Sequence, residues 1–202
     1  MNLLNEHPSM SAPRLKVINL FGAPGMGKSG IRGGLFFLMK ACHLSVEEVS
    51  EHAKHLVHTG QRWQLKDEQT AVFGKQLLAQ NLVARNGYDY AITDSPLQLC
   101  SFYAPADYYS ETFPLLVDEA HAKFDNINFF LSRDLGADEA PFEERGRVHD
   151  RQASLQAESE MRGFLADRGV TCIDLPINLT TPWRILEHVL PGVAPLPIFG
   201  TP

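Results

Sequence analysis

A lysine and a serine stand together at the end of a glycine-rich stretch between residues 22 and 29. There the chain reads Gly-Ala-Pro-Gly-Met-Gly-Lys-Ser, which matches the pattern G-x-x-x-x-G-K-[ST] in full. Glycines let the backbone curl so that successive N–H groups point at phosphate oxygens, and a following helix adds its positive end. We therefore expect this P-loop to bind the phosphates of a nucleoside triphosphate. The predicted contacts come from Gly22, Ala23, Pro24, Gly25, Met26, Gly27, Lys28, Ser29 and Gly30.

The polar residues of the P-loop, with one aspartate further along, predict ATP and Mg²⁺ as cofactors. Lys28 is expected to reach the β- and γ-phosphates, and Ser29 to offer its hydroxyl to Mg²⁺, a hard cation that prefers oxygen ligands. Asp94 follows an apolar run and is expected either to hold the same ion through water or to orient a substrate hydroxyl. An aspartate just before Pro96 would also suit a turn or a helix cap.

Transfer of a phosphoryl group also needs a proton acceptor and positive charge near the transferred group. Glu51 is the candidate base, although a solvated carboxylate at a helix start would look the same. Arg133, Arg145 and Arg147 are the candidate donors to the γ-phosphate, and a merely charged loop is the alternative.

Two further residues are expected on the acceptor side, together with Glu51. Ser95 follows the candidate metal ligand directly, so its hydroxyl is placed to help bind the acceptor. Tyr103 comes a few residues later and offers a ring on which a nucleobase can stack, although core packing suits a tyrosine equally well.

The elements that must position these residues alternate between strand and helix patterns. Apolar runs rich in strand formers predict strands, and apolar residues at helical spacing predict helices. Such alternation predicts an α/β fold, a three-layer P-loop NTPase sandwich with a mainly parallel five-stranded sheet. The predicted strands are 15–21, 46–49, 88–93, 127–131 and 170–174, and the predicted helices are 27–42, 67–85, 111–124, 151–167 and 182–190.

Two of the predicted helices carry specific packing expectations. Gly33 and Gly34 lower helix propensity, which predicts a close approach of another element to the first helix. In the helix over 67–85, one apolar stripe is expected to face the core. It consists of Val72, Phe73, Leu77, Leu78 and Leu82.

Length and composition favour a single domain over 1–202 that needs no disulfide or zinc site. The three cysteines are widely spaced and form no CxxC pair, which predicts a reducing, cytoplasmic setting. No apolar run is long enough to span a membrane, and the net charge of −6 draws no polyanion by itself. The charged segment 133–150 is expected to act as a lid, and 191–202 is a proline-rich tail.

A P-loop alone does not separate kinases, GTPases and motor ATPases. The base-reading segment N/T-K-x-D of GTPases is absent, and 202 residues are few for a motor ATPase. A small kinase is therefore the favoured hypothesis. A non-catalytic protein that uses ATP to order a binding surface is an alternative from another class.

Beyond the P-loop, several short segments occur in a recognisable order. They are Val-Ser-Glu-His-Ala-Lys at 49–54, Asp67 with Gln69, Ile-Thr-Asp-Ser-Pro-Leu at 92–97, Asn-Ile-Asn-Phe-Phe-Leu-Ser-Arg at 126–133 and Gly146 with Arg147. In this order they resemble a bacteriophage family of P-loop kinases related to nucleotide kinases.

The resemblance covers roughly residues 15–174 and implies a nucleotide-type acceptor. The family includes kinases that phosphorylate the hydroxymethyl group of 5-hydroxymethyl-deoxyuridine in phage DNA, a step of thymidine hypermodification. This acceptor is favoured by resemblance, and a free deoxynucleoside monophosphate is the alternative. The chain departs from the family at Gly30, where threonine is frequent, and at Arg32-Gly33-Gly34, which replaces a more ordinary helical stretch.

Overall fold

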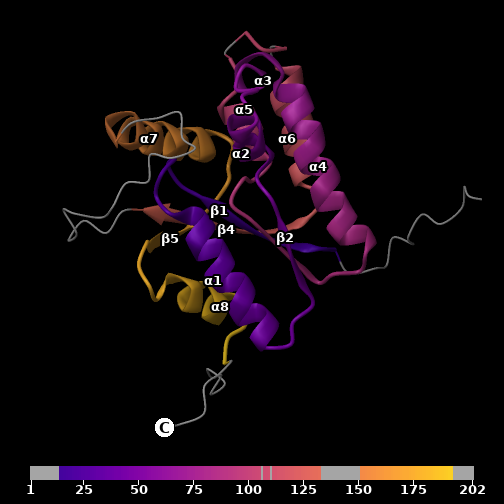
Figure 1. Cartoon of the computed structure of the whole chain (residues 1–202), viewed down its shortest axis with the longest axis vertical. Helices are drawn as coiled ribbons and strands as arrows, with labels where there is room; N and C mark the ends of the chain where they lie inside the picture. Colours follow the sequence, from indigo (N-terminus) through magenta and orange to yellow (C-terminus); the bar gives the residue numbers. More distant parts are fainter. Residues whose placement is uncertain (1–13, 106, 110, 133–150, 193–202) are drawn as a thin grey trace, which may run out of the picture.

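The structure is a computed structural model that describes residues 14–105, 107–109, 111–132 and 151–192, with side chains absent from the description at 151–155. Strands and helices alternate through most of it (Figure 1). In chain order they are β1 (Lys16–Phe21), α1 (Lys28–Ala41), β2 (Val46–Val49), α2 (His52–His58), α3 (Gln64–Asp67), α4 (Gln69–Arg85), β3 (Tyr90–Thr93), α5 (Gln98–Phe102), α6 (Thr112–His121), β4 (Asp125–Ser132), α7 (Arg151–Asp167), β5 (Ile173–Pro176) and α8 (Thr181–Val189).

The five described strands form one parallel sheet in the order β2-β3-β1-β4-β5. The chain runs from β1 to the edge strand β2, returns through β3 beside β1, and then crosses to β4 and β5 on the other side, so the strand order reverses at β1. Ligands of open parallel sheets bind beyond the carboxyl ends of the strands at such a point. The predicted α/β P-loop fold with a parallel five-stranded sheet is confirmed, and its sheet directs attention to the segments that follow β1, β2 and β3.

Helices cover both faces of the sheet (Figure 1). Successive side chains of a strand point to opposite faces, and β1 shows this alternation. Ile18 and Leu20 pack with α1 and α8, whereas Val17 packs with α4 and α6. Phe21, at the carboxyl end of β1, belongs to a smaller cluster with Met161 of α7. The core thus holds the carboxyl end of β1 rigidly from both sides.

The rotation of α4 about its axis differs from the predicted one. Leu78 and Leu82 are 50% and 48% exposed, so the prediction that they are buried is wrong. The buried face carries apolar residues and three glutamines instead, and one of these amides is hydrogen-bonded to Thr93 and to the backbone of α2. This orientation therefore includes polar contacts within the core, which the spacing of apolar residues does not predict. The buried residues of α4 are Gln69, Val72, Phe73, Gln76, Gln80 and Val83.

Several boundaries also differ from the predictions. The helix predicted over 67–85 is α4, which starts two residues later at Gln69, because Glu68 leaves helical geometry with φ −131° and ψ 46° and separates α4 from the short helix α3. The last strand begins at Ile173, where it pairs with Phe129. A methyl group on Gly34 would lie 3.1 Å from the ring of Pro182, which confirms close packing there, whereas nothing lies near Gly33. No helix of the described chain is long and apolar enough to cross a membrane.

Candidate functional site

The P-loop follows β1 and opens α1, as predicted, and its backbone requires glycine. Gly22 has φ 142°, and a Cβ atom there would lie 2.6 Å from the carbonyl oxygen of Leu131. Gly27, which precedes the helix, has φ 90°. L-residues with side chains rarely adopt such angles. Helix α1 then starts without a side-chain cap and with no acidic residue in its first turn, which suits a helix end that binds an anion.

Lys28 lies against the backbone of the loop it belongs to. Its Nζ donates hydrogen bonds to the carbonyl oxygens of Gly22 and Ala23, at 2.7 and 2.9 Å. These contacts hold a positive charge at the mouth of the loop, next to the helix start. The arrangement suits the predicted contact with phosphate oxygens, which would offer the ammonium group stronger, charged acceptors.

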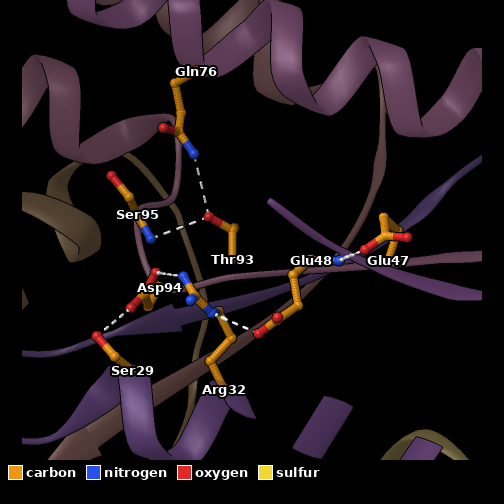
Figure 2. Close-up of polar contacts among 8 residues, drawn as sticks. All are labelled: Ser29, Arg32, Glu47, Glu48, Gln76, Thr93, Asp94 and Ser95. Carbon is orange, nitrogen blue, oxygen red and sulfur yellow. Dashed lines mark hydrogen bonds and ion pairs between the residues drawn. The ribbon is translucent and has the colours of Figure 1, made fainter. Parts of the chain in front are cut away.

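Ser29, Asp94, Arg32 and Glu48 form a continuous polar chain beyond the carboxyl ends of β1 and β3 (Figure 2). The hydroxyl of Ser29 donates to Oδ2 of Asp94 at 2.8 Å, and Nη1 of Arg32 donates to Oδ1 at 2.7 Å. Nε of Arg32 donates to Oε1 of Glu48 at 2.8 Å. Asp94 is only 3% exposed. Both oxygens of this buried carboxylate therefore have a donor.

Arg32 is a site residue that the sequence analysis noted only as a departure from a family pattern. Burial opposes its charge, but the carboxylates of Asp94 and Glu48 outweigh burial and raise the pKa of Arg32 above its ordinary value. The guanidinium therefore stays charged and compensates the buried Asp94. Its position four residues after Lys28, one helical turn further on, was the signal in the sequence.

The turn after β3 is held by a second set of hydrogen bonds from α4. The amide of Gln76 donates to Oγ1 of Thr93 at 3.4 Å and accepts a hydrogen bond from the backbone N–H of His52 at 3.3 Å. The backbone N–H of Ser95 also donates to Oγ1 of Thr93, at 3.1 Å (Figure 2). Because Thr93 and Gln76 are buried, these bonds fix the turn that carries Asp94.

A cavity of about 310 Å³ adjoins the P-loop, and we refer to it as the P-loop cavity. Its volume is at the lower end of the range of roughly 300–1,000 Å³ typical of small-molecule sites. Its lining combines charged and polar side chains with apolar ones. The lining residues are Pro24, Lys28, Glu51, Ala53, Lys54, Val57, Arg62, Leu65, Lys66, Gln69, Val72, Asp94, Ser95, Leu99, Cys100 and Tyr103.

The structure brings many of the predicted site residues together around this cavity. Glu51 caps the start of α2 and lines the cavity with Ser95 and Tyr103. Lys28 and Asp94 line it from the P-loop side. Gly30 is exposed in the first turn of α1 and lies outside the lining. The roles assigned to these residues remain predictions. Arg133, Arg145, Arg147 and the proposed lid 133–150 lie outside the described residues.

Four lining residues with charged or amide side chains were not assigned to the site from the sequence. They are Lys54 of α2, Arg62 before α3, Lys66 of α3 and Gln69 at the start of α4. Their types are common on helix surfaces, so only the fold, which turns α2, α3 and α4 around one space, distinguishes them.

The polar groups at the P-loop fit a magnesium ion that binds together with nucleotide phosphates. In the part of the chain that the structure describes, no three His, Cys, Asp or Glu side chains gather as a metal centre. Mg²⁺ in nucleotide sites needs few protein ligands, because phosphates and water supply the rest. Ser29 Oγ and Asp94 Oδ2, 2.8 Å apart, are hard oxygen donors of this kind.

Comparisons with known proteins bear on the fold. No protein-family model matches the sequence, and no curated protein matches it. Among solved structures, the chain is similar to the crystal structure of NadR protein in complex with NR, with a TM-score of 0.62 and 14% sequence identity. The match covers 89% of this chain and 52% of that chain, so this chain spans about half the length of its structural neighbour. At this identity the likeness shows a shared fold.

Proposed function

We propose that the protein is a kinase that transfers the γ-phosphoryl group of ATP to a hydroxyl of a nucleotide-type acceptor. The observation that carries the proposal is that the P-loop and the cavity share a wall. Pro24 and Lys28 belong to both, and the lining also includes Glu51 and Asp94, which is hydrogen-bonded to Ser29 of the P-loop. A donor phosphate in the P-loop would face whatever the cavity holds, which is the requirement for in-line transfer.

Each of these residues has a distinct part in the proposed reaction. Lys28 and the helix start of α1 stabilise negative charge on the phosphates. Ser29 and Asp94 would hold Mg²⁺, which neutralises charge on the phosphate oxygens. Glu51 accepts the proton of the attacking hydroxyl. Arg32 keeps Asp94 in one orientation through its 2.7 Å contact, so that the other carboxylate oxygen faces Ser29.

We further propose 5-hydroxymethyl-deoxyuridine in DNA as the acceptor, on the strength of the sequence resemblance. A cavity of about 310 Å³ is small for a base pair, so the target nucleotide would have to be unpaired or extruded from the duplex, as in other enzymes that modify bases. The alternative acceptor is a free deoxynucleoside monophosphate, which would need no such extrusion.

The test uses γ-labelled ATP and three acceptors: DNA containing 5-hydroxymethyluracil, ordinary DNA, and free deoxynucleoside monophosphates. Label in the first acceptor alone supports the DNA kinase, and label in free nucleotides alone refutes that acceptor. If no acceptor is labelled while ATP binds, the non-catalytic alternative is favoured. Where an acceptor is labelled, Asp94→Asn should abolish turnover while ATP still binds.

A further inference from the structure

Gln69 has a buried polar atom without a partner in the wall of the P-loop cavity. The residue is 2% exposed, and its Oε1 has no hydrogen-bond partner among the residues that the structure describes. Leaving a buried acceptor unsatisfied costs about 1–3 kcal/mol. A residue that retains this cost at the edge of a cavity is suited to a ligand that brings the missing donor.

The orientation of this amide is decided by its neighbour. Nε2 of Gln69 donates to the backbone carbonyl of Leu65. A carbonyl only accepts hydrogen bonds, so the amide nitrogen must face it and Oε1 must point elsewhere. The complementary ligand group is therefore an N–H donor. Nucleobases carry such donors on their pairing edges, and uracil-type bases carry one at N3.

Three cations line the same cavity as Gln69. Lys54 is half-buried, whereas Arg62 and Lys66 are exposed. Within the described part of the chain, none of the three takes part in an ion pair. In a protein of net charge −6, this grouping is a local positive field that suits a phosphate group.

Two of these groups, Lys66 and Gln69, come from elements that lie far from the P-loop helix. Lys66 belongs to α3, and Gln69 follows it at the start of α4. Figure 1 shows α3 at the outer end of the helical layer that contains α4 and α6, well separated from α1. Apolar side chains also line the cavity, and they suit the faces of a base. They are Val57, Leu65, Val72, Leu99 and Cys100, the last with its pKa raised by burial to about 12.

We infer that the P-loop cavity binds a nucleotide with its phosphate on Lys54, Arg62 and Lys66 and an N–H of its base on Oε1 of Gln69. The inference rests on the proposed function and sharpens it. The nucleotide's own phosphate lies away from α1, so it is not the group that receives the γ-phosphoryl. In a uracil-type base, the edge that carries the C5 substituent lies across the ring from N3 and would face the P-loop.

The first test measures binding to the unaltered protein, without ATP and therefore without turnover. The probes are 5-hydroxymethyl-deoxyuridine 5′-monophosphate, its N3-methyl derivative, the nucleoside without phosphate, and a short single-stranded oligonucleotide with one such base. We expect at least about tenfold weaker binding of the N3-methyl derivative and of the nucleoside, in line with the loss of one buried or charge-assisted hydrogen bond. Equal binding of the N3-methylated and unmethylated probes overturns the role of Gln69.

The second test uses matched variants. Gln69→Met keeps the length of the side chain and removes its polar atoms, and Gln80→Met does the same on the same helix at a buried glutamine outside the cavity lining. Gln69→Met should weaken monophosphate binding about tenfold or more and change the melting temperature little, since removal of the unsatisfied acceptor offsets the lost hydrogen bond to Leu65. Gln80→Met should leave binding unchanged. Unaltered binding in Gln69→Met refutes the assignment.

The cations are tested in the same way. The double variant Arg62→Gln, Lys66→Gln should weaken binding of the monophosphate and of the oligonucleotide but not binding of the nucleoside. The control is Lys75→Gln, at an exposed position of α4 outside the lining. If binding of the nucleoside is weakened as much as binding of the monophosphate, the phosphate assignment is wrong. Where transfer from ATP occurs, a nucleoside diphosphate product refutes the proposed orientation. If these probes bind as described but no phosphate is transferred, the kinase proposal fails and the binding site stands.

Discussion

Replacing Arg32 by methionine should expose how much Asp94 depends on its guanidinium partner. The variant keeps most of the aliphatic stem of Arg32 but removes both hydrogen bonds, the 2.7 Å contact to Asp94 and the 2.8 Å contact to Glu48. The side chain of Asp94 is 2% exposed, so its carboxylate would be left with the Ser29 hydroxyl and almost no water.

The expected cost follows from this burial. Removing one partner of a buried ion pair costs roughly 3–5 kcal/mol, because the other charge stays desolvated. The Arg32 side chain is 19% exposed, so water screens part of the pair, and we expect a loss of about 2–3 kcal/mol in the free energy of unfolding. For a chain of this size, that lowers the melting temperature by about 5–10 °C.

The assay is denaturant and thermal unfolding, with and without a non-hydrolysable ATP analogue and Mg²⁺. Because Mg²⁺ compensates the Asp94 charge, the deficit of Arg32→Met should shrink when both are present. Asp174→Asn is the control, since it removes an Arg162 ion pair in which the Asp174 side chain is 61% exposed, and it should cost about 0.5 kcal/mol or less. Stability of Arg32→Met within about 0.5 kcal/mol of the parent protein would refute the reasoning.

Three further predictions follow from other contacts. Lys28→Ala should lower phosphoryl transfer about 10²–10³-fold, and unchanged steady-state activity would contradict the nucleotide pose. Asn19→Val should lower the free energy of unfolding by about 1–3 kcal/mol, because the amide that donates hydrogen bonds from β1 to Asn126 and Asn128 of β4 is lost. An unchanged midpoint of denaturant unfolding would refute this. Burial lowers the pKa of His121 from 6.5 to about 4, so below about pH 6.5 the unfolded chain binds a proton that the folded chain does not. Stability is lost as pH falls towards 4, by up to about 3 kcal/mol, and His121→Gln should flatten this part of the pH profile of unfolding.

The sequence alone determined the fold class and the position of the P-loop. Both depend on local physics: strand-forming runs stopped by glycine, and a glycine pattern whose backbone angles other residues rarely adopt. Gly22 and Gly27 have the positive φ angles that this pattern implies. The positions of Asp94 and Glu51 were equally predictable, because the carboxyl ends of parallel strands meet at one edge of the sheet. Because of that geometry, both residues line one cavity together with Lys28.

Tertiary structure alone decided which side chains complete the site. Periodicity favoured Leu78 and Leu82 as buried residues of α4, yet packing turned the glutamines inward, because hydrogen bonds to Thr93 and α2 satisfy Gln76 in the core. The position of Arg32 one helical turn after Lys28 is only a weak local signal, and no local pattern distinguishes Gln69. Their environments arise from residues distant in sequence, Asp94 and Glu48 for Arg32 and the walls of the cavity for Gln69. Contacts between distant segments exist only once the chain has folded, which is why no short stretch of sequence specifies them.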